Sequence, residues 1–260
     1  MAIEFRSHPG LVVYFTVGDP DLKTSKQIAL AAIDAGADVL ELGVPFSDPL
    51  LDGPVIQRAN ERAVRNGTRL TDVLSLAGEL RRERPHVGMV LFSCLNPLLR
   101  MGLESFASAA KGAGVDAVLV TDIIAEESEE YLAILRRCHL QPIFLAAPTS
   151  PDERLARIAA LSEGFIYAIS RVGITGAQQE VAEDARQLVT RLRRYTNLPI
   201  ALGFGIANAN HVAAVAEFSD AAVVGSAIVA VIEKSTPSNA AAAVGAFIAG
   251  LRAPANVSTG

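Results

Sequence analysis

Eight short apolar runs alternate along the chain with segments of helical spacing, and this alternation limits the possible folds more than any other feature. The runs are predicted to be strands at residues 11–16, 39–42, 87–92, 117–120, 142–146, 165–169, 199–202 and 221–224. They are too apolar to leave one face in water, which indicates a parallel sheet covered by helices. Eight strand–helix units predict a (β/α)8 barrel, with residues 1–260 as one domain and a flexible tail from about residue 253.

A doubly wound open sheet is the competing architecture. It more often carries a glycine-rich turn after its first strand, and the turn here reads Gly18-Asp19-Pro20. A weak internal sequence similarity supports the barrel. The segments that join a helix to the next strand end in aspartate at residues 35–38, 113–116 and 218–220. In a barrel the carboxyl ends of all the strands share one mouth, where barrel enzymes keep their chemistry.

Composition excludes several classes of function. The net charge is −5 and no basic cluster is interleaved with aromatic residues, so no nucleic-acid partner is expected. Arg81, Arg82 and Arg84 are expected to form the solvated end of a helix. No apolar run approaches the roughly 18–20 residues of a membrane span. Two cysteines and four scattered histidines lack metal-ligand spacing, so we expect no metal and a soluble protein in the reducing cytoplasm.

One carboxylate interrupts an apolar strand, and it needs an explanation. Glu41 lies within residues 39–42, and Asp48 and Asp52 follow on a proline-rich loop before a helix. A buried carboxylate needs a partner or a changed pKa. Glu41 could pair with a lysine or arginine of a neighbouring strand, and the aspartates could cap turns or the helix. The functional alternative is that Glu41 and Asp52 meet at one mouth.

Glycines follow the last two strands. Gly203-Phe204-Gly205 ends one, and Gly225-Ser226 ends the other and opens a short helix. Such positions suit either tight turns or the binding of an anion such as phosphate through N–H groups. The loop at residues 170–180 is either a closing lid or an ordinary surface loop. These features together indicate acid–base chemistry by carboxylates on a small phosphorylated molecule, without a cofactor.

Five segments resemble the tryptophan synthase α subunit family, in the family's order and over about residues 8–250. They are YFTVGDP (14–20), ELGVPFSDPLLDGPVIQRA (41–59), SRVGITG (170–176), GFGI (203–206) and GSAIV (225–229). The resemblance implies the retro-aldol cleavage of indole-3-glycerol phosphate into indole and glyceraldehyde 3-phosphate.

The resemblance also implies the roles of individual residues. Glu41 would be the general acid–base, Asp52 would accept the indole N–H, and Tyr167 would help to position the site. Tyr14, Phe92, Cys94, Leu119 and Thr175 would contact the substrate, Thr175 also bonding Asp52 when the lid closes. Backbone groups of Gly176, Gly205, Gly225 and Ser226 would hold the phosphate. An apolar wall should raise the pKa of Glu41, which suits a proton shuttle near neutral pH.

Three positions depart from the family's pattern. Cys94 stands where the family usually has tyrosine, Leu51 where it has a small residue, and Ile124 where it commonly has proline. The loops that hold Leu51 and Ile124 face the β subunit in the family. Three hypotheses remain open: an α subunit that works with a β partner in an α2β2 complex, a stand-alone lyase that releases indole for secondary metabolism, and a non-catalytic modulating subunit. The presence of Glu41 and Asp52 argues against the third.

Overall fold

The computed structural model describes residues 3–48, 52–169, 178–203 and 205–253. Within these residues nine short strands form one sheet in the order β5-β4-β3-β2-β1-β9-β8-β7-β6, and every paired neighbour is parallel. The strands are β1 (Gly10–Thr16), β2 (Val39–Gly43), β3 (Gly88–Ser93), β4 (Ala117–Val120), β5 (Gln141–Ile143), β6 (Leu145–Ala146), β7 (Ile166–Ile169), β8 (Ile200–Gly203) and β9 (Ala221–Val224).

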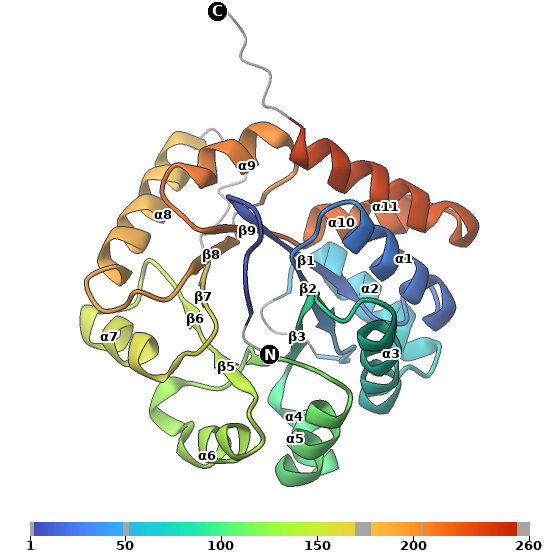
Figure 1. Ribbon diagram of the computed structural model, residues 1–260, viewed down its shortest axis with the longest axis horizontal. Coiled ribbons are helices and arrows are strands. Elements are labelled where there is room, and N and C mark those ends of the chain that lie inside the picture. Colours follow the sequence, from blue (N-terminus) through green and yellow to red (C-terminus); the bar gives the residue numbers. More distant parts are fainter. Residues whose placement is uncertain (1–2, 49–51, 170–177, 204, 254–260) are drawn as a thin grey trace, which may run out of the picture.

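The chain itself closes the sheet into a barrel. β5 and β6 are separated by Phe144 alone, and together they replace the single strand predicted at residues 142–146. β5 pairs with β4 and β6 pairs with β7, so the bent segment is the eighth wall of the ring (Figure 1). The predicted (β/α)8 architecture is confirmed, and the extra strand boundary is a bend within one wall.

Helices surround the barrel on all sides (Figure 1). They are α1 (Leu22–Asp34), α2 (Pro54–Arg65), α3 (Leu70–Glu83), α4 (Leu95–Met101), α5 (Leu103–Gly112), the 3-10 turn η1 (Ala125–Glu127), α6 (Glu129–Arg137), α7 (Asp152–Leu161), α8 (Gln178–Leu192), α9 (Ala209–Ala216), α10 (Ser226–Lys234) and α11 (Pro237–Arg252). None of the helices in the described part of the chain is long and apolar enough to cross a membrane.

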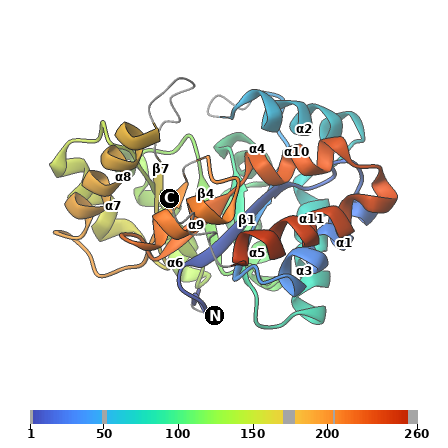
Figure 2. The ribbon, with the colours of Figure 1, turned by 90° about the horizontal axis from the view of Figure 1, so that it is seen from above.

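Alternation along the strands divides the core into two parts. One set of side chains fills the barrel interior, and it includes Val12, Val39, Val90 and Val223. The other set, between the strands and the helices, forms the larger core. Phe5 of the N-terminal segment packs against Phe165 with ring centroids 5.8 Å apart, which fills the barrel at the amino ends of the strands. In Figure 2 the N-terminus lies at this end, and α2 lies at the opposite end.

Arg81 is not a solvated residue, as had been expected for the end of its helix. Its guanidinium forms an ion pair with Asp116 at 2.6 Å and donates hydrogen bonds to the carbonyl oxygens of Gly114 and Val87. It therefore joins the end of α3 to the entries of β3 and β4. Composition alone cannot reveal this role, because the carbonyl acceptors lie on other elements. The predicted tail, residues 254–260, lies outside the described residues.

Candidate active site at the carboxyl ends of the strands

Glu41 projects from the middle of β2 into the barrel interior. Its strand neighbours in register are Tyr14 on β1 and Val90 on β3. Glu41 is fully buried, and neither carboxyl oxygen has a hydrogen-bond partner among the described residues. Burial disfavours the charged form and raises the pKa of Glu41 to about 8. The structural alternative, an ion pair with a basic residue, is therefore not what the described part of the chain shows.

Two tyrosines approach this carboxyl group because glycines leave room for them. A Cβ atom at Gly43 would lie 2.7 Å from the hydroxyl oxygen of Tyr14, and a Cβ at Gly203 would lie 2.9 Å from that of Tyr167. Tyr14 is buried and Tyr167 is half-buried at the wall of the barrel interior. Burial raises the pKa of Tyr14. Burial raises the pKa of Tyr167 well above its usual value, and the charge of Glu41 adds to the shift. Both hydroxyl groups are consequently protonated at neutral pH and can donate hydrogen bonds.

Asp52 lies immediately before α2 and is half-buried. The amide nitrogen Nδ2 of Asn60 donates to its carboxylate oxygen Oδ2 at 3.0 Å. Burial raises the pKa of Asp52 to about 6, and the Asn60 hydrogen bond opposes that rise. Two carboxyl groups at one end of the barrel therefore titrate on opposite sides of neutral pH.

A cavity of about 670 Å³ opens between these groups and the last strands. Its lining residues are Tyr14, Asp52, Gly53, Pro54, Val55, Ile56, Phe92, Thr121, Leu145, Tyr167, Ile169, Gly203, Gly205, Ile206, Val223, Gly225 and Ser226. The wall is mainly apolar, as in most small-molecule sites. Glu41 does not line the cavity in this structure, because its oxygens are covered. A motion of Glu41 or of its neighbours is needed before the carboxyl group can touch a ligand.

One side of the cavity suits an anion. Gly205, Gly225 and Ser226 line it, and α10 begins at Ser226 with Gly225 as its N-cap residue. A helix N-terminus presents free N–H groups and partial positive charge to a ligand. None of the lining residues is a lysine or arginine. An anion there would be held by backbone groups, as predicted from the glycines.

The remaining predicted residues fall into four groups. Tyr14 and Phe92 line the cavity with their rings in edge contact at 5.0 Å between centroids. Cys94 lines a small adjoining recess that Asp52 also borders. Leu119 is fully buried in the barrel interior and does not line the cavity, because its place in β4 lies below the strand end. Thr175 and Gly176, with Leu51, lie outside the described residues.

Several lining residues were not predicted. Thr121, Leu145, Ile169 and Val223 lie at or just beyond the carboxyl ends of their strands. Alternation along each strand was the signal that could have found them, since every second residue faces the interior. Asp122 lies just after β4, and its carboxylate accepts a hydrogen bond at 2.6 Å from the backbone nitrogen of Leu95, where α4 begins. Asp122 does not line the large cavity.

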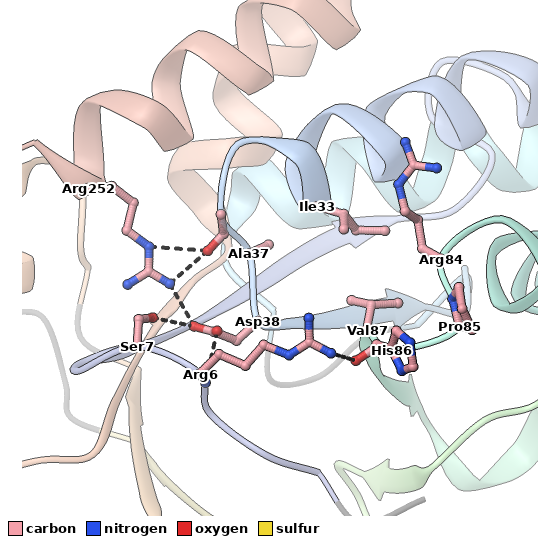
Figure 3. A pocket seen from close by; sticks show the side chains of 11 residues that line it. Arg6, Ser7, Ile33, Ala37, Asp38, Arg84, Pro85, His86, Val87 and Arg252 are labelled. Atoms are coloured by element: carbon pink, nitrogen blue, oxygen red, sulfur yellow. Dashed lines mark hydrogen bonds and ion pairs between the residues drawn. The ribbon is translucent and has the colours of Figure 1, made fainter.

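A second cavity, of about 430 Å³, lies at the opposite end of the barrel (Figure 3). Its arginines are already engaged. Arg252 donates to the carbonyl oxygen of Gly36 and pairs with Asp38 at 2.6 Å, and Arg6 donates to the carbonyl oxygen of His86. These contacts fasten the amino ends of β2 and β3 to both ends of the chain. Residues at this end of a barrel usually stabilise the fold, whereas the chemistry takes place at the carboxyl end. Among the described residues no group of three His, Cys, Asp or Glu side chains could hold a metal ion.

Comparison with known proteins gives a consistent result. A family model described as tryptophan synthase alpha chain matches residues 2–253. The tryptophan synthase alpha chain of Burkholderia thailandensis is 43% identical over 252 residues, which cover 97% of this chain and 93% of that protein. The protein of the same name from Cupriavidus metallidurans is 42% identical over 251 residues, or 96% and 95% of the two chains.

Solved structures agree with the sequence comparisons. A chain of the tryptophan synthase α2β2 complex from Pyrococcus furiosus matches with a TM-score of 0.88 and 36% identity, over 94% of this chain and 98% of that one. A chain of Mycobacterium tuberculosis tryptophan synthase matches with a TM-score of 0.85 and 34% identity, over 95% and 94%. The likeness thus extends through the whole barrel.

Proposed function

The chain belongs to the tryptophan synthase alpha chain family, and we propose that its two carboxyl groups perform the family's reaction in the large cavity. The family cleaves indole-3-glycerol phosphate, by an aldol-type lyase reaction, into indole and glyceraldehyde 3-phosphate for tryptophan biosynthesis. Of the residues described above, Glu41 is the proton donor and Asp52 the proton acceptor. Tyr167 positions the groups around them.

The placement of the two acids carries this assignment: Asp52 lines the large cavity, and Glu41 projects from β2 into the same barrel interior. Their pKa values, shifted by burial, agree with it. With a pKa of about 8, Glu41 is mainly protonated at pH 7 and can give a proton. With a pKa of about 6, Asp52 is mainly ionised and can accept one. Pairs of titratable groups whose environments separate their pKa values supply the acid and the base of many enzymes. Both values also lie close enough to the working pH for rapid proton transfer.

The proposed steps conserve protons and electrons. Glu41 gives its proton to the ring carbon that bears the side chain, while Asp52 accepts the hydrogen of the indole N–H. The bond between that ring carbon and the glycerol carbon then breaks, and its electron pair returns to the ring. The adjacent hydroxyl group loses its proton to Glu41 and becomes the aldehyde, and Asp52 returns its proton to the ring nitrogen. Both carboxyl groups finish in their starting states.

Binding of the substrate follows from the shape of the cavity. Its apolar wall, with Tyr14 and Phe92, suits the indole ring, and Cys94 lies in the recess beside them. The backbone at Gly205, Gly225 and Ser226 suits the phosphate group. We assign Gly176 to the phosphate and Thr175 to Asp52 on the resemblance alone. Leu119 would act only through the packing of the barrel interior.

A β subunit is the partner that we propose for this chain. The matched Pyrococcus furiosus chain comes from an α2β2 complex. Leu99 on α4 and Ile124 after β4 are 53% and 46% exposed, the largest exposures of big apolar side chains in the described residues. Both lie near the carboxyl ends of β3 and β4, on the side of the barrel where the site opens. Exposed apolar side chains on this side of the barrel would be covered by a partner that docks over the site.

The free thiols of Cys94 and Cys138 support a place in the reducing cytoplasm. Neither cysteine is bonded to another, and a cytoplasmic biosynthetic role needs no disulfide.

Release of indole from indole-3-glycerol phosphate tests the proposed function. The purified protein is assayed alone and with the β subunit of a relative, and the variant Asp52→Asn serves as the control for background release. We expect turnover that the β subunit raises at least about tenfold, because docking completes a site that is only partly assembled in the free chain. High turnover without any response to the β subunit would favour the stand-alone lyase. No turnover in either case would contradict both enzymatic hypotheses.

A further inference from the structure

Asn60 is buried in the first part of α2 at the edge of the site. Its side chain is only 3% exposed, whereas Arg58 and Glu61 on the same helix face water. Both ends of its amide group make contacts. Nδ2 donates to Oδ2 of Asp52 at 3.0 Å, and Oδ1 accepts a longer bond, 3.4 Å, from the backbone nitrogen of Phe46. A buried amide that is used at both ends occupies a fixed orientation.

The amide group joins the two ends of the loop between β2 and α2. Phe46 follows β2 by three positions, and Asp52 precedes the first residue of α2 by two positions. Among the described residues, Asn60 is the hydrogen-bond partner of the Asp52 carboxylate, while Gln57 donates to the backbone oxygen of Asp52 instead. Asn60 thus holds the side chain of Asp52, whereas Gln57 holds its main chain.

We propose that Asn60 is a positioning residue that holds Asp52 in the orientation needed to accept the indole N–H. This inference rests on the role proposed above for Asp52. The contact to Oδ2 leaves Oδ1 as the oxygen that faces the ligand. Asn60 does not line the large cavity, so it acts through Asp52 and not on the substrate.

The chemistry of the contact supports the role. A hydrogen bond to an ionised carboxylate favours the charged form, and here it opposes the effect of burial on the pKa of Asp52. The other titratable groups that sense the charge of Asp52 are Tyr14 on β1, Cys94 before α4 and Tyr167 on β7. Glu41 on β2 acts on both tyrosines. None of these groups is a cation, and among the described residues Asn60 is the one whose side chain donates a hydrogen bond to the Asp52 carboxylate.

Direct titration of Asp52 provides the first test. The protein is labelled with ¹³C at the aspartate carboxyl carbons and titrated by NMR, and Asp52→Asn identifies the signal. Asn60→Leu and Asn60→Ala both remove the donor, the first keeping a branched side chain and the second adding no bulk, and Gln57→Ala is the matched control from the same turn. We expect the pKa of Asp52 to rise by about one unit or more in both Asn60 variants and to stay unchanged in the control. An unmoved pKa in the Asn60 variant that folds would overturn the proposal.

Kinetics on the same variants separate positioning from general damage. In Asn60→Leu the acid limb of the kcat/KM profile for indole-3-glycerol phosphate should move to higher pH. We expect kcat to fall about 10- to 100-fold, with a much smaller change in KM. An unchanged acid limb, together with an inactive Asp52→Asn variant, would remove the role of Asn60 and leave that of Asp52 standing. Wild-type turnover in Asp52→Asn would remove both.

Discussion

Glu41 is a carboxyl group kept inside the barrel with no hydrogen-bond partner in the described residues, so its neutral form is favoured until about pH 8. In the unfolded chain the same group loses its proton near its ordinary pKa of 4.5. Between these two values the folded state binds more protons than the unfolded state. The free energy of unfolding must therefore fall as the pH rises from about 4.5 to about 8.

The variant Glu41→Gln should abolish this part of the pH dependence. Glutamine keeps the size and polarity of the neutral acid and cannot ionise. Near pH 4.5 the two proteins should have similar free energies of unfolding, and by pH 8 the variant should be more stable by a few kcal/mol. Urea unfolding at both pH values measures the difference. Glu104→Gln, a change at an exposed acid on α5, is the control. A difference between Glu41→Gln and wild type that does not grow with pH would contradict the burial argument.

At the scale of single residues, the sequence was informative where a side chain conflicted with its surroundings. An acid in an apolar strand is such a conflict, and the raised pKa of Glu41 agrees with the prediction. The fit of Tyr14 over Gly43 and of Tyr167 over Gly203 was not predictable, because it depends on the register between neighbouring strands. Asn60 went unnoticed because a polar residue on a helix is usually exposed.

Helix α2 is the element that links the parts of the site. It begins just after Asp52, and its contacts reach both the turn after β1 and α10. Arg62 pairs with the buried Asp19 through two bonds of 2.8 and 2.9 Å, and with Glu233 of α10 at 2.8 Å. Arg58 also pairs with Glu233. Helix α2, which starts two positions after Asp52, is thereby fixed to α10, which starts at the proposed phosphate position.

Removing Arg62 should destabilise the protein by about 2 kcal/mol, because the buried carboxyl group of Asp19 would lose its ion-pair partner. The figure is lower than for a fully buried pair, since Arg62 is partly exposed. Urea unfolding of Arg62→Ala measures the loss, and Arg65→Ala, an exposed neighbour on α2, is the control. The double variant Arg62→Ala with Asp19→Asn should recover part of the stability. Equal losses for Arg62→Ala and Arg65→Ala would contradict this account.

The boundaries of helices are hard to predict near proline, because proline can either end a helix or occupy its first turn. Pro97 reads as a helix breaker, yet α4 contains it in its first turn, where proline is tolerated. Pro237 is likewise the first residue of α11, for the same reason. The bend at Phe144 leaves no mark in the sequence, because residues 142–146 form one uninterrupted apolar run.

At the scale of the whole molecule, the two ends of the barrel do different work. The amino end is filled by the N-terminal segment and joined by arginines, while the carboxyl end holds the large cavity. The common mouth followed from the strand count alone. The cavity at the amino end did not, because its walls come from residues near 6, 36, 86 and 252, which only the closed fold brings together (Figure 3).

The central claim is that distant segments of one barrel bring Glu41 and Asp52 to the same substrate. Turnover of indole-3-glycerol phosphate by Glu41→Gln, measured beside wild type with a β subunit present, tests it most directly. We expect a loss of at least about 1000-fold in kcat, because glutamine cannot give up a proton and the pKa of the Tyr14 and Tyr167 hydroxyl groups is too high for them to replace the acid. Equilibrium titration should still show binding of the substrate. A Glu41→Gln variant that folds, binds the substrate and cleaves it at nearly the wild-type rate would contradict the account.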